Sequence, residues 1–254
     1  MKGRAGPGAG AYVTGTVELN LAGRRLSLEM KVPAGRTRPA ALLPLYRAAA
    51  DGVVETALRA AEANGETISC TKGCGACCRQ LVPISAIEAR RLRMLVNDMP
   101  RSRRAVIRER FAAARVKLDQ AGLLATLSEP GESTDEQIHA LGLAYFAQAI
   151  PCPFLEDECC SIHAERPIGC REYLVTSPAE HCAQPKPENI SLVKMPATVA
   201  RAIRNLEPAK RGQARWVPLI VAMEWADAHP DRSLPRQGTE IATEFIQELT
   251  GRKL

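Results

Sequence analysis

All nine cysteines of this 254-residue chain lie in two dense blocks, which constrain the fold more than any other feature. The first block covers residues 70–78 in the run CTKGCGACC, and the second covers residues 152–182. Thiolates are soft ligands that suit zinc, copper(I), iron and iron–sulfur centres, and closely spaced cysteines can converge on one ion. Each block therefore predicts half of a metal site.

Four cysteines from each block are predicted metal ligands. They are Cys70, Cys74, Cys77, Cys78, Cys152, Cys160, Cys170 and Cys182. Eight thiolates could fill two four-sulfur sites, each holding zinc or an iron–sulfur cluster, or one site with the other thiols free or redox-active. Neighbouring side chains of an extended segment point in opposite directions, so the adjacent pair in the first block could serve two centres, or only one of them could ligate. The ninth cysteine, Cys159, is predicted to be a spare thiol.

The rest of the composition favours a cytoplasmic protein with reduced thiols. A chain of this length buries a core without disulfide staples, and the N-terminal run MKGRAGPGAGAYV lacks the apolar stretch of a signal peptide. The longest apolar run, residues 216–225, contains a proline and a glutamate and is shorter than the roughly 20 residues that span a bilayer. The sequence therefore predicts no contact with a membrane.

A positive net charge does not by itself indicate nucleic-acid binding. Lys plus Arg number 34 and Asp plus Glu number 28, which gives a formal charge of +6. Aromatic residues are only 4%, so few side chains could stack on bases, and the arginines of residues 101–115 alternate with apolar residues as on a solvated helix face. Part of the excess could offset the charge of about −2 that four thiolates leave on a divalent ion.

The N-terminal half of the chain predicts one hairpin and several helices. Alternating apolar residues on both sides of Ala22-Gly23 indicate a β-hairpin. Apolar residues at helical spacing predict a helix over residues 39–64 with Gly65 after its end, and the Ser85 and Glu88 pair predicts a capping box for a helix that ends before Pro100. A basic helix is expected over residues 102–121. Ser133 and Glu136 have the same capping-box spacing, ahead of a helix that extends to Ala149.

The remaining patterns complete a mainly α fold with a small β component, in which helices surround an irregular cysteine-rich core. Residues 154–155 and 160–162 predict a small hairpin, and helices are expected near residues 196–205, 217–228 and 239–249. We expect three parts: an N-terminal β-hairpin segment over residues 1–36, a metal-binding domain over residues 37–190, and a C-terminal helical extension packed on it over residues 191–254.

The chain contains the three segments CTKGCGACCR, CPFL and CSIHAERPIGCREY. Together they resemble the YkgJ-type cysteine-cluster family, which is described as chelating zinc or iron. The resemblance covers about residues 68–183 and implies ligand roles for the eight cysteines named above. It departs at Cys70, which lies one residue farther from Cys74 than the C-x2-C pattern requires. It departs again at His163, where tyrosine is common, so this histidine is expected to be a half-buried ring and not a ligand.

The arginines of the matched motif have two possible roles each. Arg166 and Arg171 could donate to backbone carbonyls or a carboxylate, or they could donate to cluster sulfur and neutralise thiolates, and we predict that both contact the cofactor. His139, His181 and His229 are isolated, and for an isolated histidine a surface or satisfied role is expected. His181 beside Cys182 is the best candidate among them for a nitrogen ligand.

The leading functional hypothesis is a metal-binding protein in which thiolates from two distant segments hold zinc or iron, as a mononuclear ion or an iron–sulfur cluster. The alternative is an enzyme. The resemblance reaches proteins that modify flagellin lysines, which would suggest a metal-dependent protein-modifying enzyme. A dithiol oxidoreductase using Cys74 and Cys77 is a further option, although the βαβ context of such pairs is missing. A protein partner is possible, and an adaptor role through the basic helix ranks below both.

Overall fold

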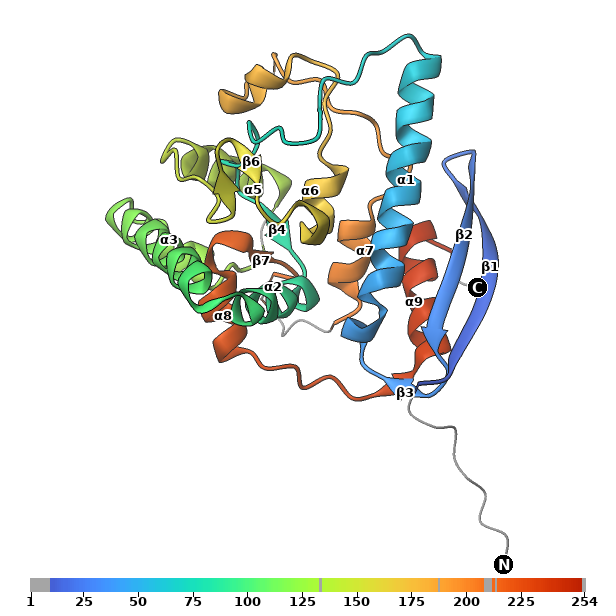
Figure 1. Cartoon of the computed structure of the whole chain (residues 1–254). Helices are drawn as coiled ribbons and strands as arrows, with labels where there is room; N and C mark the ends of the chain where they lie inside the picture. Colours follow the sequence, from blue (N-terminus) through green and yellow to red (C-terminus); the bar gives the residue numbers. More distant parts are fainter. Residues whose placement is uncertain (1–9, 133, 187, 208–211, 213, 253–254) are drawn as a thin grey trace, which may run out of the picture.

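The computed structural model describes residues 10–132, 134–186, 188–207, 212 and 214–252. Helices make up most of the regular structure in these residues, and their strands form small two-stranded antiparallel sheets (Figure 1). The prediction of a mainly α fold with a small β component is therefore confirmed. No helix in these ranges is long and apolar enough to cross a membrane.

The predicted N-terminal hairpin is present and forms the longest sheet. Strands β1 (Tyr12–Leu21) and β2 (Arg24–Pro33) pair antiparallel across a two-residue turn. Both turn residues have positive φ, 49° at Ala22 and 82° at Gly23, which is the backbone geometry of a tight hairpin turn. Alternate side chains from Val17 to Leu21 and from Leu26 to Val32 are fully or partly buried, so the period-two pattern correctly marked the inner face there.

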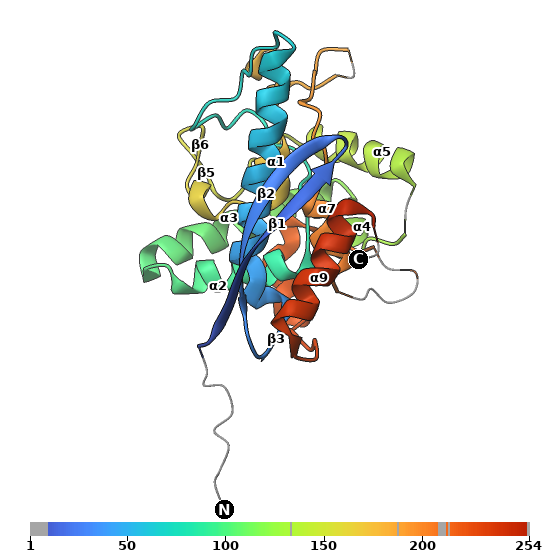
Figure 2. The same ribbon diagram turned by 90° about the vertical axis from the view of Figure 1, so that its right-hand side faces the viewer.

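The hairpin lies across two long helices, α1 (Leu43–Ala63) and α9 (Gly238–Thr250), as Figure 2 shows. A short 3-10 turn, Pro39–Leu42, precedes α1, and Gly65 with φ of +77° follows its end as predicted. The hairpin, α1, α9 and α7 (Val199–Asn205) share one apolar core, in which the rings of Tyr46 and Phe245 lie 4.8 Å apart. This core fixes one side of the molecule independently of the cysteines.

Two helices behind the cysteine loops begin and end where the sequence predicts. Helix α2 (Ala86–Asp98) starts with a reciprocal capping box: the Ser85 hydroxyl accepts from the Glu88 N–H, and the Glu88 carboxylate accepts from the Ser85 N–H. Pro100 separates α2 from α3 (Arg101–Gln120), whose buried residues recur at helical spacing. The second apolar core packs between these helices and α8 (Ala222–Ala228).

The predicted cap of the next helix is wrong by one residue. After α4 (Leu124–Ser128), helix α5 (Asp135–Phe146) is capped by Thr134 and Gln137, which bond each other's backbone N–H. Ser133, the expected cap, lies outside the described residues. The helix also ends at Phe146 and not at Ala149, whose φ of 49° is left-handed and cannot continue a right-handed helix.

Short strands and helical turns connect the larger elements. The predicted small hairpin is confirmed as β5 (Leu155–Glu156) and β6 (Cys159–Cys160), with positive φ at the two turn residues. The other elements are β3 (Arg36–Thr37) with β8 (Arg236–Gln237), β4 (Pro83–Ile84) with β7 (Val217–Pro218), the helix α6 (Ile168–Glu172), and 3-10 turns at His163–Glu165, Ala179–Ala183 and Leu219–Val221.

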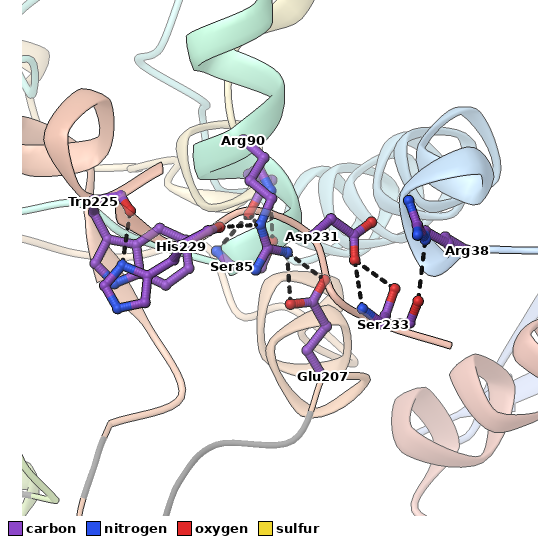
Figure 3. Close-up of polar contacts among 9 residues, drawn as sticks. Arg38, Ser85, Arg90, Glu207, Trp225, His229, Asp231 and Ser233 are labelled. Carbon is purple, nitrogen blue, oxygen red and sulfur yellow. Dashed lines mark hydrogen bonds and ion pairs between the residues drawn. The ribbon is translucent and has the colours of Figure 1, made fainter. Parts of the chain in front are cut away.

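A polar network centred on Arg90 joins α2 to the C-terminal part of the chain (Figure 3). The Arg90 guanidinium donates to both carboxylate oxygens of Glu207 at 2.8 Å and to the carbonyl of His229 at 2.8 Å. It also lies 5.4 Å from the ring centre of Trp225, on which the His229 ring stacks. This cation therefore has three partners, and the network connects α2 to α8 and to Glu207.

The division of the chain into three parts stays a prediction. The apolar core beneath the hairpin contains side chains from all three expected segments, including Leu28 of β2, Tyr46 of α1 and Phe245 of α9. The expected C-terminal helices are present as α7, α8 and α9, but the second begins later than predicted, because residues 217–221 form β7 and a 3-10 turn ahead of α8.

Candidate metal centre

The first cysteine block folds as a series of tight turns between α1 and β4. Backbone N–H groups of Cys74, Cys78 and Gln80 each donate to the carbonyl three residues earlier, at 2.9 to 3.1 Å. The loop is tied to a later segment at its start, where the Ser69 N–H donates to the Val175 carbonyl at 3.0 Å. The second block runs beside this loop in Figure 1.

The β5–β6 hairpin packs directly on this loop at its glycines. A Cβ atom on Gly75 would lie 2.2 Å from the Glu158 carbonyl oxygen and 2.6 Å from Leu155 Cδ1, so only glycine fits there. A Cβ atom on Gly73 would lie 3.2 Å from the Cys159 sulfur. The Cys152 N–H donates to the Cys78 carbonyl at 2.7 Å. These contacts bring the two blocks together along the backbone.

Helix α6 brings Cys170 to the same place. Its first N–H, that of Ile168, donates at 2.7 Å to the Glu88 carboxylate of the α2 capping box. The buried Glu88 side chain therefore joins the starts of two helices. At the other end of α6, the Glu172 carboxylate accepts from the N–H groups of Val199 and Ala200, at 2.5 and 3.2 Å.

Thiols from both blocks line one cavity of about 320 Å³. The lining cysteines are Cys74, Cys77, Cys78, Cys152, Cys160 and Cys170. The other two predicted ligands lie beside it. The Cys70 sulfur accepts from the Val175 N–H at 3.4 Å, and the buried Cys182 hydrogen-bonds the hydroxyl of Tyr173, which itself lines the cavity.

The environment keeps most of these thiols protonated in the absence of a cation. Burial raises the pKa of Cys152 to about 12 and that of Cys182 to about 11, and it raises the pKa of Cys170 well above its usual value. A hydrogen bond from Cys78 is the main cause that lowers the pKa of Cys77 to about 7, and the charge of Arg166 contributes. The buried thiols with a raised pKa therefore need a nearby positive charge to ionise, and Cys77 is the exception.

The thiols share the cavity without meeting at one point. Among the described residues, no three His, Cys, Asp or Glu side chains are grouped so that they could hold a metal ion. The donor set nevertheless fits zinc or iron by its chemistry, because these metals take sulfur ligands and deprotonate them. A buried nitrogen also lacks a partner here: within the described part of the chain, Nε of Arg166 makes no hydrogen bond. Metal binding would require several cysteine side chains to turn inward.

The two predicted arginines differ in their surroundings. Arg166 lines the cavity, and its charge offsets part of the rise in the pKa that burial causes at Cys160. The Arg171 guanidinium instead donates to Asp51 at 2.9 Å and to the Ala164 carbonyl at 2.5 Å, and it is not among the lining residues. Its predicted contact with the cofactor stays a prediction.

The histidines and the ninth cysteine occupy different positions. His163 is half-buried and lines the cavity, while His139 and His229 are exposed. Nδ1 of His181 lies 2.9 Å from the Asn189 carbonyl. Cys159 is exposed at the tip of the β5–β6 hairpin. Sequence reasoning missed Glu172 and Arg204, which also line the cavity. Glu172 lies within the second block but has no recognisable ligand spacing, and Arg204 lies outside both blocks.

Comparison with known proteins gives one match. The family model CxxCxxCC, described as "Putative zinc- or iron-chelating domain", matches residues 69–190, just under half of the chain. No curated protein and no solved structure gives a significant match. The matched range contains every cysteine of the chain and ends before α7.

Proposed function

We propose that this chain, whose residues 69–190 form a CxxCxxCC domain, binds zinc or iron through cysteine thiolates drawn from two distant segments. The proposed ligands are those predicted above: Cys70, Cys74, Cys77, Cys78, Cys152, Cys160, Cys170 and Cys182. One observation carries the proposal: thiols from both blocks line the same cavity, although the blocks are more than 70 residues apart in the chain.

The charge of the cavity supports this assignment. Converting neutral thiols to thiolates costs free energy in a buried site unless a cation compensates, and a divalent metal is the strongest such cation available. The hydrogen bond from Cys78 is the main cause that lowers the pKa of Cys77, and the positive charge of Arg166 adds a smaller lowering effect. The unpartnered Nε of Arg166 could also donate to a metal-bound sulfur. The chain therefore has both the donors and a charge that offsets excess thiolate.

Bound metal would supply different chemistry depending on its identity. Zinc would contribute folding free energy, and an iron–sulfur cluster would add electron transfer. The protein's own part is to hold the thiols: the hairpin contacts at Gly75 and the Glu88 bond to α6 fix the backbones that carry them. Cysteine side chains could then rotate onto an ion without movement of the surrounding helices.

Metal content and colour test the proposal. We expect protein purified without oxygen to carry stoichiometric zinc or iron, and iron–sulfur clusters to give a broad brown absorption near about 400 nm. Cys77→Ser and Cys170→Ser should each lower the metal content. Cys159→Ser is the matched control, because Cys159 is exposed and does not line the cavity, so its loss should leave metal content unchanged.

Two results would refute the proposal. If Cys77→Ser and Cys170→Ser both keep full metal loading, the proposed ligand set is wrong. If the protein carries no metal and its thiols titrate rapidly, the dithiol oxidoreductase alternative is favoured. Cys77, with its pKa lowered to about 7 chiefly by the Cys78 hydrogen bond, would then be the reactive thiol.

A further inference from the structure

The partly buried arginines of this chain follow a rule with two exceptions. Within the described residues, the guanidinium groups of all but two of them make a hydrogen bond or an ion pair with another residue. Those with partners are Arg47, Arg79, Arg90, Arg91, Arg93, Arg103, Arg104, Arg110, Arg171 and Arg236. The exceptions are Arg166 and Arg204, whose guanidinium groups make neither contact and which line the same cavity beside the cysteines.

Nearby carboxylates do not satisfy Arg204. Burial lowers the pKa of Arg204, and the negative charges of Glu88 and Glu172 raise it by a smaller amount. Both carboxylates therefore lie close to the Arg204 guanidinium. The Glu88 carboxylate, however, accepts from Ser85 and from the Ile168 N–H, and the Glu172 carboxylate accepts from two backbone N–H groups of α7. Arg204 thus lines the cavity, and its guanidinium has no hydrogen-bond acceptor among the described residues.

The cavity is larger and more apolar than a metal site alone requires. Its volume of about 320 Å³ falls at the lower end of the range of small-molecule pockets, roughly 300 to 1,000 Å³. Besides the thiols, the wall contains Val82, Pro83, Phe154 and Leu219, which come from three different segments of the chain. Apolar walls with a few polar groups are typical of sites for organic ligands.

We propose that this cavity binds a small organic anion, with a carboxylate or phosphate group on Arg204 and Arg166 and an apolar part against Val82, Phe154 and Leu219. A guanidinium presents its N–H donors in a planar fork that matches the two oxygens of a carboxylate or phosphate. The inference rests on the proposed function for the thiol side of the cavity, where the anion would lie next to the metal. Metal and anion would thus occupy one continuous site.

Calorimetric titration with simple probes tests this proposal. Benzoate and phenyl phosphate combine an oxyanion with an apolar ring, benzyl alcohol has the ring without the charge, and inorganic phosphate has the charge without the ring. We expect saturable binding of at least one aromatic anion and markedly weaker binding of the other two probes. The comparison of benzoate with phenyl phosphate identifies which anionic group the site prefers.

Variants on one helix separate a specific site from general charge. Arg204→Gln should weaken binding of the aromatic anion by about tenfold or more, because it removes a charge-assisted hydrogen bond. Arg201→Gln is the matched control: Arg201 lies on the same helix and is exposed, so its loss should change binding less than about twofold. If Arg204→Gln fails to fold, Arg204→Lys keeps the charge without the fork and should still weaken binding.

Several outcomes would overturn the proposal. They are the absence of saturable binding of both aromatic anions, equal effects of Arg204→Gln and Arg201→Gln, and binding of benzyl alcohol or inorganic phosphate as tight as that of the aromatic anions. Metal content is measured on every sample. If the protein lacks zinc and iron but binds the anion through Arg204, the proposed function is refuted and the anion site is supported. If the protein carries metal but binds no anion, the anion site is refuted and the proposed function is supported.

Discussion

Arg90 and Arg204 are partly buried cations of the same kind, but their surroundings differ. The Arg90 guanidinium donates to Glu207 and to the His229 carbonyl and lies beside the Trp225 ring, so its partners are inside the protein (Figure 3). Arg204 lines the thiol cavity, and its guanidinium makes no hydrogen bond in the described residues.

This difference separates stability from function. Hydrogen bonds to Glu207 and to the His229 carbonyl offset part of the free energy lost by desolvating Arg90, so this network can serve the fold alone. The cavity instead contains protonated thiols, an unpartnered Arg166 Nε and an unpaired Arg204. Unsatisfied polar groups that share a cavity indicate groups from outside the chain, which here are the proposed metal and anion.

Removing the metal should have the largest effect and should affect only one of the two regions. If the centre is structural zinc, a chelator withdraws on the order of 10 kcal/mol from the folding free energy. We expect peptides from residues 69–80 and 152–182 to lose protection from hydrogen–deuterium exchange. Peptides from α2 and α8, which the Arg90 network holds together, should keep most of their protection. Unchanged exchange in the cysteine segments after complete metal removal would contradict this prediction.

Arg90→Ala should destabilise the fold without touching the metal. It leaves the Glu207 carboxylate and the His229 carbonyl without their donor, and we expect a loss of about 3 kcal/mol in the free energy of unfolding. Denaturant titration measures the loss, and metal analysis should show full loading. Arg101→Ala is the control, because Arg101 is exposed and its replacement should change stability by less than about 0.5 kcal/mol. Loss of metal from Arg90→Ala would show that the two regions are coupled.

Gly75→Ala should affect both stability and metal content. The added Cβ would lie 2.2 Å from the Glu158 carbonyl oxygen, so the β5–β6 hairpin must move away from the first cysteine loop. We expect a loss of about 2 kcal/mol from this overpacking, together with reduced metal loading. Gly142→Ala is the matched control. Nothing lies within 4 Å of its Cβ position, and in helix α5 alanine should stabilise by about 0.5 to 1 kcal/mol.

Local signals in the sequence were enough to predict most elements. The Ser85 and Glu88 capping box, the turn at Ala22-Gly23 and the stop at Pro100 each act over a few residues, and the structure confirms all three. The start of α5 was wrong by one residue because overlapping capping-box spacings, from Ser133 to Glu136 and from Thr134 to Gln137, both fit the pattern. Spacing alone does not choose between them.

Contacts between distant segments were beyond the reach of such signals. Cysteine spacing suggested that two blocks could meet, but it gave no sign of the backbone packing at Gly75 that joins them. Arg204 lies more than 30 residues beyond Cys170, in a segment with no motif, and only the packing of α7 on α6 brings it to the cavity. The residues that complete a site from outside its motif are therefore those that a single sequence does not reveal.

The smallest effect should come from the ion pair on the outside of the cavity. Arg79 donates to both oxygens of Glu158, at 3.0 and 2.7 Å, and so connects the first cysteine loop to the β5–β6 hairpin. The Glu158 side chain is 65% exposed, and exposed ion pairs contribute less than about 1 kcal/mol, so Arg79→Gln should lower the unfolding free energy by no more than that. Metal content should not change, because the packing at Gly75 and the Cys152 to Cys78 backbone bond remain.

Exchanging the two charges tests whether that pair has any further role. The double variant Arg79→Glu with Glu158→Arg restores the pair and should recover the stability lost in Arg79→Gln. If Arg79→Gln instead loses metal as Gly75→Ala does, while the exchanged pair does not restore it, Arg79 acts on the thiols and not on the hairpin. Arg79 would then belong with Arg166 and Arg204 as a cation of the open cavity, and the contrast with Arg90 would no longer depend on internal partners alone.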